Sequence, residues 1–238
     1  MSLLQPLWSH FVNLSNDINL LKNPFFFLLI IHSTQFTGCI FFTIIDIYNK
    51  RKINYNNIGK LFFVSLFGFL PFIYFHTNNN KLYIMNLEMN LDHKAPYLYQ
   101  FILQFIIYGL IGDLFHYNIH KLLHNNIYLK NNIHSLHHNY DDKFLYSWIL
   151  MQVHPIEILL ITCAIYTPML LFGHPMVLWF YSFFASLHAT IVHSGYNIYL
   201  LPSYFIRPQD HQIHHEINST KNYGNILKIW DIYFDTYK

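Results

Sequence analysis

Long apolar segments separated by short polar ones run through the first half of this 238-residue chain. Residues 25–45 are almost uninterruptedly apolar, about the length at which a helix crosses ~30 Å of hydrocarbon. Residues 61–75 are also apolar but contain Gly68 and Pro71, so this segment spans a membrane only with flanking residues. A third apolar segment covers residues 97–115. The pattern predicts membrane helices at the first and third segments and a shorter one, spanning or re-entrant, between them.

Two further apolar segments, residues 158–172 and 176–192, are separated only by Gly173, His174 and Pro175. So short a connection predicts a tight helical hairpin. The polar stretches on either side of this hairpin contain most of the histidines. The predicted fold is therefore an all-α integral membrane protein, with four to five membrane helices and a histidine-rich cap at one membrane face.

The composition favours a membrane protein as well. Charged residues make up 11% of the chain, whereas soluble proteins contain roughly 25%. So few charges do not cover a water-facing surface. The net charge of +2 with neutral histidines is not typical of a polyanion-binding protein, so nucleic acid is not an expected partner.

The histidines recur at helical spacing. His116, His120 and His124 are four residues apart, which places three imidazoles on one face of a helix. Two HxxHH sequences add three histidines each, at i, i+3 and i+4. They comprise His134, His137, His138, His211, His214 and His215. A closed zinc site uses four ligands, so these six imidazoles and one HxxxH pair predict a two-metal centre in the cap.

The basic residues predict the orientation of this cap. If all histidine clusters share one membrane face, the predicted helices place 11 of the 14 Lys and Arg residues on that face. These are Lys50, Arg51, Lys52, Lys60, Lys121, Lys130, Lys143, Arg207, Lys221, Lys228 and Lys238. Lys and Arg favour the cytoplasmic side of a membrane. The histidine clusters and the C-terminus are therefore expected in the cytosol, and the N-terminus on the opposite side.

Two acidic residues lie close to these clusters. Asp113 precedes His120 by seven residues on the same helical face, where it either orients a ligand imidazole or faces the headgroups as a helix-end carboxylate. Glu157 follows His154 by three residues at the start of the fourth apolar segment, where an acid is costly. It either has a role in catalysis or pairs with His154 to close the start of the helix.

Five segments occur in an order and at intervals that resemble the fatty acid hydroxylase/sterol desaturase superfamily of integral membrane di-iron oxygenases. They are DLFHYNIHKLLHNNIYLKNNIHSLHH, HPIE, HATIVHSGYN, HQIHH and NYGNILKIWDIYFDT, within residues 110–238. The HY dipeptide of the first segment and HSGY resemble the 4-methylsterol oxidases. KNYGNILKIWD is similar to the sterol 5-desaturases and the alkylglycerol monooxygenase-like group. Asp235 stands where members of the superfamily commonly have glycine.

The resemblance implies a set of metal ligands. It adds His193 and His188, from the return helix of the hairpin, to the histidines identified by spacing. The implied ligands are His120, His124, His134, His137, His138, His188, His193, His211, His214 and His215. The residues expected beside them are Asp113, His116, His154 and Glu157. His116 has either this supporting role or a structural one.

The resemblance also implies an activity. Residues 97–238 would form a fatty acid hydroxylase-like catalytic domain, preceded by a membrane region, residues 1–96, that carries no motif. Such an enzyme uses two iron ions, dioxygen and external electrons to hydroxylate or desaturate a lipid substrate, namely a sterol, a fatty acyl chain or an ether lipid. Zinc can replace iron in purified samples. The expected electron donor is cytochrome b5 with its reductase, and the expected location is the endoplasmic reticulum.

Two functions of other classes are left open by the residues alone. A histidine-rich membrane metal transporter is one, although its ligands should lie near the bilayer midplane within broken helices. The histidine clusters of this chain lie beyond the ends of the predicted spans. A catalytically inactive scaffold that binds metal for structural reasons is the other.

Overall fold

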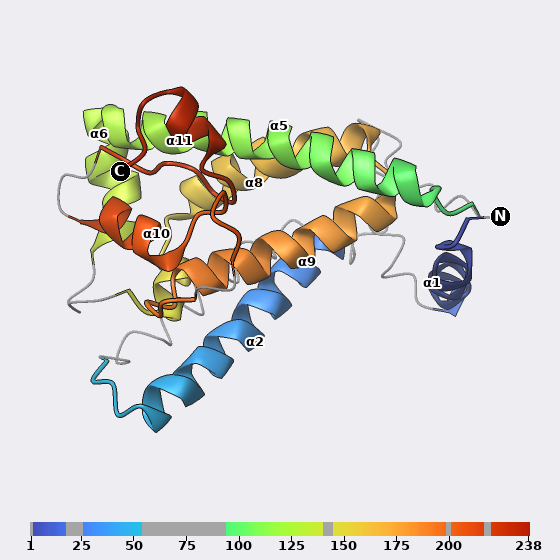
Figure 1. Cartoon of the computed structure of the whole chain (residues 1–238), viewed down its shortest axis with the longest axis horizontal. Coiled ribbons are helices and arrows are strands. Elements are labelled where there is room, and N and C mark those ends of the chain that lie inside the picture. Colours follow the sequence, from blue (N-terminus) through green and yellow to red (C-terminus); the bar gives the residue numbers. More distant parts are fainter. Residues whose placement is uncertain (1, 18–25, 54–93, 140–144, 199–200, 217–219) are drawn as a thin grey trace.

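A computed structural model describes residues 2–17, 26–53, 94–139, 145–198, 201–216 and 220–238 (Figure 1). The predicted short helix at residues 61–75 lies outside these ranges. Within them, every regular element is a helix, and β pairing is limited to one isolated bridge between Phe205 and Leu227. The all-α prediction is therefore confirmed.

Four long helices dominate the described part of the chain. They are α2 (Phe26–Tyr48), α5 (Leu98–Asn125), α8 (Pro155–Phe172) and α9 (Pro175–Val192), and each is long and apolar enough to cross a membrane. Three of them match the predicted segments within three residues at each end. In contrast, α5 continues ten residues beyond the predicted end at residue 115, so the first three histidines lie on the same uninterrupted helix.

Short helices form a cap at one end of these long helices (Figure 1). They are α6 (Ile127–Leu129), the π-helix η3 (Lys130–His134), α7 (Ser135–His138), the 3-10 helix η4 (Ser147–Met151), α10 (Pro208–His215) and α11 (Ile229–Tyr233). The first HxxHH sequence lies on η3 and α7, and the second on α10. All histidine clusters therefore lie at the same end of the molecule.

The opposite end is formed by the N-terminus and the α8–α9 turn. Helix α1 (Gln5–Asp17) places the Trp8 ring 5.7 Å from that of Trp179, and the Gln5 side chain accepts a hydrogen bond of 2.9 Å from the Ala95 backbone. The chain therefore enters α5 at this end and leaves it at the cap. This agrees with the predicted arrangement, in which the N-terminus and the hairpin turn lie away from the histidines.

Two contacts fix how the long helices lie against one another. A Cβ atom at Gly112 of α5 would lie 2.8 Å from the carbonyl oxygen of Ile165 in α8, so only glycine allows this close approach. At the cap, Arg51 donates to the carbonyl oxygens of Ser194 (2.9 Å) and Leu145 (2.6 Å). This arginine ties the end of α2 to the end of α9.

Candidate metal centre

Nine histidine side chains of the cap gather in two groups. We call them the five-histidine group and the four-histidine group. The five-histidine group contains His120, His124, His134, His138 and His214, and the four-histidine group contains His137, His193, His211 and His215. Within each group, one ring nitrogen from every member lies within 4.8 Å of those of the others. Nine of the ten histidines predicted as ligands are therefore brought together.

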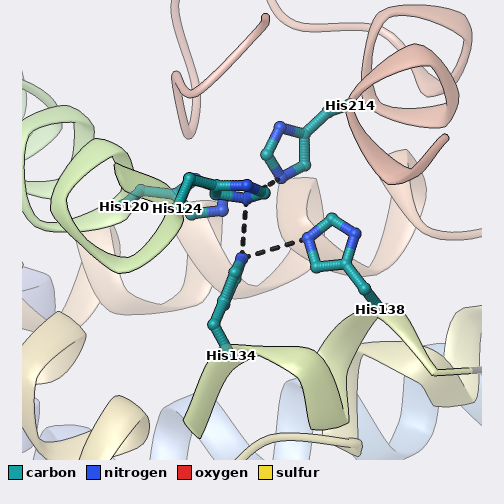
Figure 2. Close-up of side chains that lie close together, drawn as sticks. All are labelled: His120, His124, His134, His138 and His214. Carbon is teal, nitrogen blue, oxygen red and sulfur yellow. Dashed lines mark hydrogen bonds between the residues drawn. The ribbon is translucent and has the colours of Figure 1, made fainter. Parts of the chain in front are cut away.

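The five-histidine group draws its members from α5, from the first HxxHH sequence and from α10. The Nε2 atom of His134 lies 2.8 Å from Nε2 of His124 and 3.0 Å from Nε2 of His138 (Figure 2). The Nε2 atom of His124 lies 3.2 Å from that of His214. The ring of His120 lies beside them, with its centroid 4.4 Å from that of His214.

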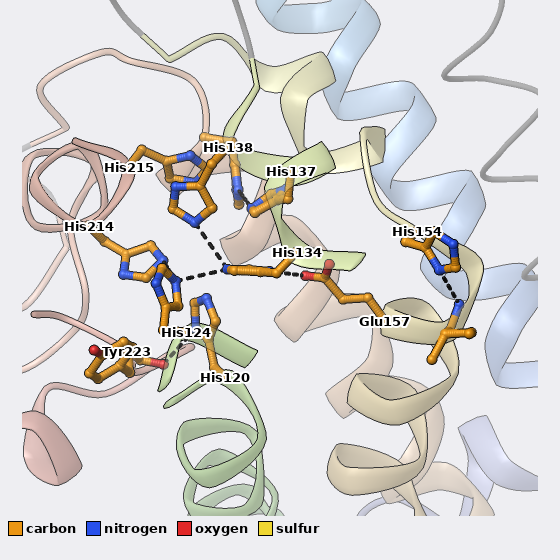
Figure 3. A network of polar contacts seen from close by, with 12 residues as sticks. His120, His124, His134, His137, His138, His154, Glu157, His214, His215 and Tyr223 are labelled. Atoms are coloured by element: carbon orange, nitrogen blue, oxygen red, sulfur yellow. Dashed lines mark hydrogen bonds and ion pairs between the residues drawn. The ribbon is translucent and has the colours of Figure 1, made fainter. Parts of the chain in front are cut away.

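The outer ring nitrogens of three members of this group are held by oxygen atoms. Nδ1 of His134 lies 2.8 Å from Oε1 of Glu157 (Figure 3). Nδ1 of His120 and of His214 donate to the backbone oxygens of Tyr223 (3.0 Å) and Lys221 (2.9 Å). A carbonyl oxygen only accepts, so these Nδ1 atoms carry the proton and the Nε2 atoms facing the centre do not.

The four-histidine group is buried throughout. Nε2 of His211 lies 2.9 Å from Nε2 of His193 and 3.0 Å from Nε2 of His215. Nε2 of His193 also lies 3.4 Å from that of His137. Because Nδ1 of His193 donates to the Ala189 carbonyl oxygen at 2.8 Å, its Nε2 atom also lacks a proton.

The surroundings keep these imidazoles neutral. Burial, which disfavours the charged form, lowers the pKa of His138 to about 3 and that of His193 to about 4, and neighbouring imidazoles add to the effect. Burial and neighbouring imidazoles likewise lower the pKa of other members outside the membrane helices. These are His134, His137, His211, His214 and His215. Neutral imidazole is the form that binds metal.

This donor set fits two metal ions. In the five-histidine group, the unprotonated Nε2 atoms of His120, His134 and His214 converge, and lone pairs at such distances repel unless a cation lies between them. Neutral imidazole suits zinc, copper, iron and nickel. The nine histidines are the residues that could hold such ions, and Glu157 supports His134 as carboxylates support metal-bound histidines.

Two residues expected beside the centre have other partners than the sequence indicated. His154 caps α8, where its Nδ1 accepts the backbone N–H of Ile156, and it does not pair with Glu157 (Figure 3). Asp113 is buried, and its carboxylate accepts the backbone N–H groups of residues 225–227 instead of an imidazole. Residues 225–227 do not form a helix, so their three backbone N–H groups need acceptors from elsewhere, and the Asp113 carboxylate provides them.

His116 and His188 both lie outside the two groups. The His116 ring is 5.1 Å from that of His120, and its Nδ1 atom is buried without a hydrogen bond to any residue in the described ranges. Nε2 of His188 donates to the Ile206 carbonyl oxygen at 3.0 Å. His188 is thus not gathered with the other predicted ligands. Its Nε2 atom is used by the Ile206 backbone, and its buried Nδ1 atom has no hydrogen-bond partner in the described ranges.

Sequence reasoning missed Asp231, which organises the C-terminal segment. Its carboxylate accepts the backbone N–H groups of Tyr223 and Gly224, both at 2.8 Å, and the Thr236 hydroxyl. The segment it holds includes the Tyr223 carbonyl that binds His120. The signal available in the sequence was an acidic residue between apolar ones in a chain with only 12 acidic residues.

A cavity of about 170 Å³ extends from the histidines into the helix bundle. Histidines from both groups close one end of it, and its other walls are mainly aliphatic and come from α2, α8 and α9. These walls include Leu28, Ile31, Ile158, Ile161, Ile165 and Ala185. Helix α2 supplies one wall, although residues 1–96 carry no family motif. A cavity of this kind can hold an apolar molecule against the histidine groups.

Comparison with known proteins finds a family whose model matches this chain. The model of the fatty acid hydroxylase family matches residues 105–236, which is more than half of the chain. Methylsterol monooxygenase 1 of Danio rerio is 33% identical over 133 residues, which cover 54% of this chain and 44% of that protein. Cholesterol 25-hydroxylase-like protein 2 of Danio rerio is 25% identical over 258 residues, which cover 97% of this chain and 87% of that protein. The match thus spans less than half of the methylsterol monooxygenase. No solved structure matches the chain significantly.

Proposed function

This chain belongs to the fatty acid hydroxylase family, and from that premise we propose that it is a membrane oxygenase that uses dioxygen and external electrons to hydroxylate or desaturate a lipid. One observation carries the proposal: two groups of neutral imidazoles close the inner end of an apolar cavity between membrane helices. A transporter would need its ligands near the bilayer midplane. An inactive scaffold would not need such a cavity.

The two histidine groups would each hold an iron ion. Iron bound there would supply the reduction of dioxygen and the oxidant that removes hydrogen from an unactivated C–H bond. The protein contributes orientation, because oxygen partners of the outer ring nitrogens fix the imidazoles of His120, His134, His193 and His214. The aliphatic cavity walls would align an apolar chain or ring and keep water away from it.

The remaining parts of the proposal follow from the family. Residues 97–238 would form the catalytic domain and residues 1–96 a membrane region, of which α2 adds a wall to the cavity. The sequence contains no Rossmann glycine pattern or haem-binding motif, so electrons would come from a separate donor, such as cytochrome b5 and its reductase. The cap would face the cytosol from the endoplasmic reticulum membrane. Sterols are the first lipids to test, because both relatives have sterol names.

Lipid-dependent dioxygen consumption tests this function. The full chain, purified in detergent and loaded with ferrous iron, should consume dioxygen only when a lipid extract and a reductant are both added. Mass spectrometry of the lipids should show a gain of one oxygen or a loss of two hydrogens. Consumption that is indifferent to lipid, or no consumption by iron-loaded protein, would contradict the proposal. Metal content alone does not decide the matter, because zinc outcompetes ferrous iron for nitrogen ligands.

A further inference from the structure

Several polar side chains interrupt the aliphatic walls of the cavity, among them His32, Tyr166 and Ser186, and two more are candidates for contact with a bound molecule. Gln35 lies near the middle of α2 and Thr162 lies on α8, and both line the cavity beyond the histidines. A polar side chain within a membrane helix is costly unless it faces protein or a functional site. These two side chains therefore call for a partner.

Neither side chain has a partner in the protein. Among the residues that the structure describes, nothing forms a hydrogen bond with the Gln35 amide or the Thr162 hydroxyl. Ser186, which lines the same cavity, differs because its hydroxyl donates to the Ser182 carbonyl oxygen at 2.6 Å. The amide and the hydroxyl thus offer both donors and acceptors to whatever fills the cavity.

The helix contacts place Gln35 at a defined depth. The rings of Phe26 and Trp179 are 5.2 Å apart, and a Cβ at Gly38 would meet Thr190, so α2 and α9 run side by side in the same direction. Gln35 precedes Gly38 by three residues, and His193 follows Thr190 by three. At 1.5 Å per residue, Gln35 lies about 9 Å along the bundle from the four-histidine group.

Helix α8 gives a second, independent measure of depth. Its Glu157 bonds to His134 of the five-histidine group. Thr162 follows Glu157 by five residues, about 8 Å along the helix. Both residues therefore lie at a similar depth, between one and two helical turns from His193 on one side and from Glu157, the partner of His134, on the other, and they line different walls of one cavity.

We propose that Gln35 and Thr162 bind a hydroxyl group of the lipid substrate and thereby select which carbon lies at the histidine groups. The substrate class is a lipid that carries a hydroxyl roughly 8–9 Å from the carbon that reacts, and not a plain hydrocarbon chain. This inference rests on the proposed function. An unfilled hydrogen-bonding site inside a membrane disfavours an analogue that lacks the hydroxyl, because the buried polar groups then have no partner.

The test measures binding to the metal-free full chain in detergent, which does not depend on turnover. The probes are two pairs of radiolabelled lipids that differ only in a hydroxyl group: cholesterol with 5-cholestene, and octadecanol with octadecane. The wild type should bind the hydroxylated member of at least one pair about tenfold more tightly. The double variant Gln35→Leu/Thr162→Val should reduce that preference to about twofold or less, whereas Thr162→Ser should keep most of it.

Thr37→Val is the matched control, because Thr37 lies on the exposed face of α2 and does not line the cavity. It should leave the preference as in the wild type. A wild type that binds both members of each pair equally, or not at all, would overturn the inference, as would a double variant with unchanged preference. If the wild type still shows lipid-dependent dioxygen consumption, the proposed function stands and only the hydroxyl site is wrong. Without that consumption, the proposed function itself fails.

Discussion

The five-histidine group and the four-histidine group are built from the same two HxxHH sequences but in opposite proportions. The first sequence gives His134 and His138 to the five-histidine group and His137 to the other. The second gives His211 and His215 to the four-histidine group and His214 to the five-histidine group. In both HxxHH sequences, the residues at i and i+4 belong to one histidine group and the residue at i+3 belongs to the other. Each sequence therefore contributes to both groups, and neither group can form without the other's scaffold.

The two groups differ in their surroundings. His124 and His138 of the five-histidine group are half-buried, and Glu157 and two backbone carbonyls hold three of its outer nitrogens. The four-histidine group is fully buried, and three of its members line the cavity. Most of the grouped histidines that face the cavity therefore belong to the four-histidine group, with His120 as the member from the other group, whereas the five-histidine group is the one with carboxylate support.

Removing one ligand from each group should have the largest effect. His137→Ala and His214→Ala should each abolish turnover, because each removes a ligand from one of the two required ions, while membrane insertion stays intact. His137→Ala leaves three ligands in its group and should retain about one of the two ions, whereas His214→Ala leaves four, enough to hold an ion, and should retain both ions with one ligand set altered. Metal analysis and dioxygen consumption of the purified variants measure this. Loss of both ions in each variant would show that the groups bind as one unit and would break the comparison.

The control for these variants is His10→Ala, because His10 is exposed on α1 at the far end of the molecule. This variant should keep both ions and full turnover. Retained activity in His137→Ala or His214→Ala would remove that residue from the ligand set.

Low pH should reduce the free energy of unfolding of the metal-free protein, because buried, neutral histidines occur in both groups. The pKa of His193 is lowered to about 4 and that of His138 to about 3, mainly by burial, below the unfolded value of 6.5. The stability that these neutral histidines contribute is complete above pH 6.5 and is lost as the pH falls toward 4 and 3, because only the unfolded chain then takes up protons. Each such histidine lowers the free energy of unfolding by about 1.4 kcal/mol per pH unit in that window.

Chemical unfolding of the metal-free protein at pH 7.5, 6 and 5 measures this dependence. The free energy of unfolding should be nearly constant between pH 7.5 and 7 and should then fall steadily. His10→Ala should give the same profile, because that histidine is exposed. A free energy that does not change down to pH 5 would show that the histidines are protonated as easily in the folded cap as in the unfolded chain.

Replacing Glu157 with glutamine should affect the two groups unequally. The amide oxygen keeps an acceptor for His134 Nδ1, at 2.8 Å from the present carboxylate, but the negative charge is lost. Such changes around a metal-bound histidine cost about 10- to 100-fold in metal affinity. The loss should be confined to the five-histidine group in metal titrations. Glu216→Gln, the same change at an exposed position, should leave both affinities as they are. Equal weakening of both groups would contradict the assignment of Glu157 to one of them.

The sequence predicted the parts that depend on local spacing. The lengths and positions of the apolar segments predicted three of the four long helices closely, and the HxxxH and HxxHH spacings identified eight of the nine gathered histidines. The spacing placed the three histidines of each HxxHH sequence on one helical face, and their division between the two groups was not predicted. Helix geometry is compatible with it, since i+4 is rotated by about 40° from i and i+3 by about 60° the other way. Which group takes the pair depends on tertiary packing and was not predictable.

The partners of the supporting residues could not be predicted for the same reason. Asp113 lies on the helical face expected for a contact with an imidazole. Its carboxylate oxygens instead accept hydrogen bonds from backbone N–H groups more than 100 residues away in the sequence. The carbonyl oxygens of Tyr223, Lys221 and Ala189 hold histidines, and backbone atoms leave no mark in an amino-acid sequence. His188 has ligand-like spacing, but it lies outside both groups, and its Nε2 atom bonds to the Ile206 backbone.

The smallest expected effect comes from Asp235, which stands where family members commonly have glycine. Its φ is +55°, in the left-handed region that favours glycine after a helix such as α11. The turn positions Thr236, whose carbonyl oxygen accepts the Asn222 N–H, beside the Lys221 and Tyr223 carbonyls of the five-histidine group. Asp235→Gly should therefore raise the free energy of unfolding by about 0.5 kcal/mol, and Asp235→Ala should lower it by about 1 kcal/mol.

Unfolding of both variants at pH 7.5 measures these changes, and metal titration shows whether they extend to the histidines. Because the turn lies on the side of the five-histidine group, any change in metal affinity should occur there and leave the four-histidine group unaffected. If Asp235→Gly and Asp235→Ala had the same free energy of unfolding, the left-handed backbone at this position would not explain a preference for glycine. The comparison of the two groups would then rest on Glu157 and the histidines alone.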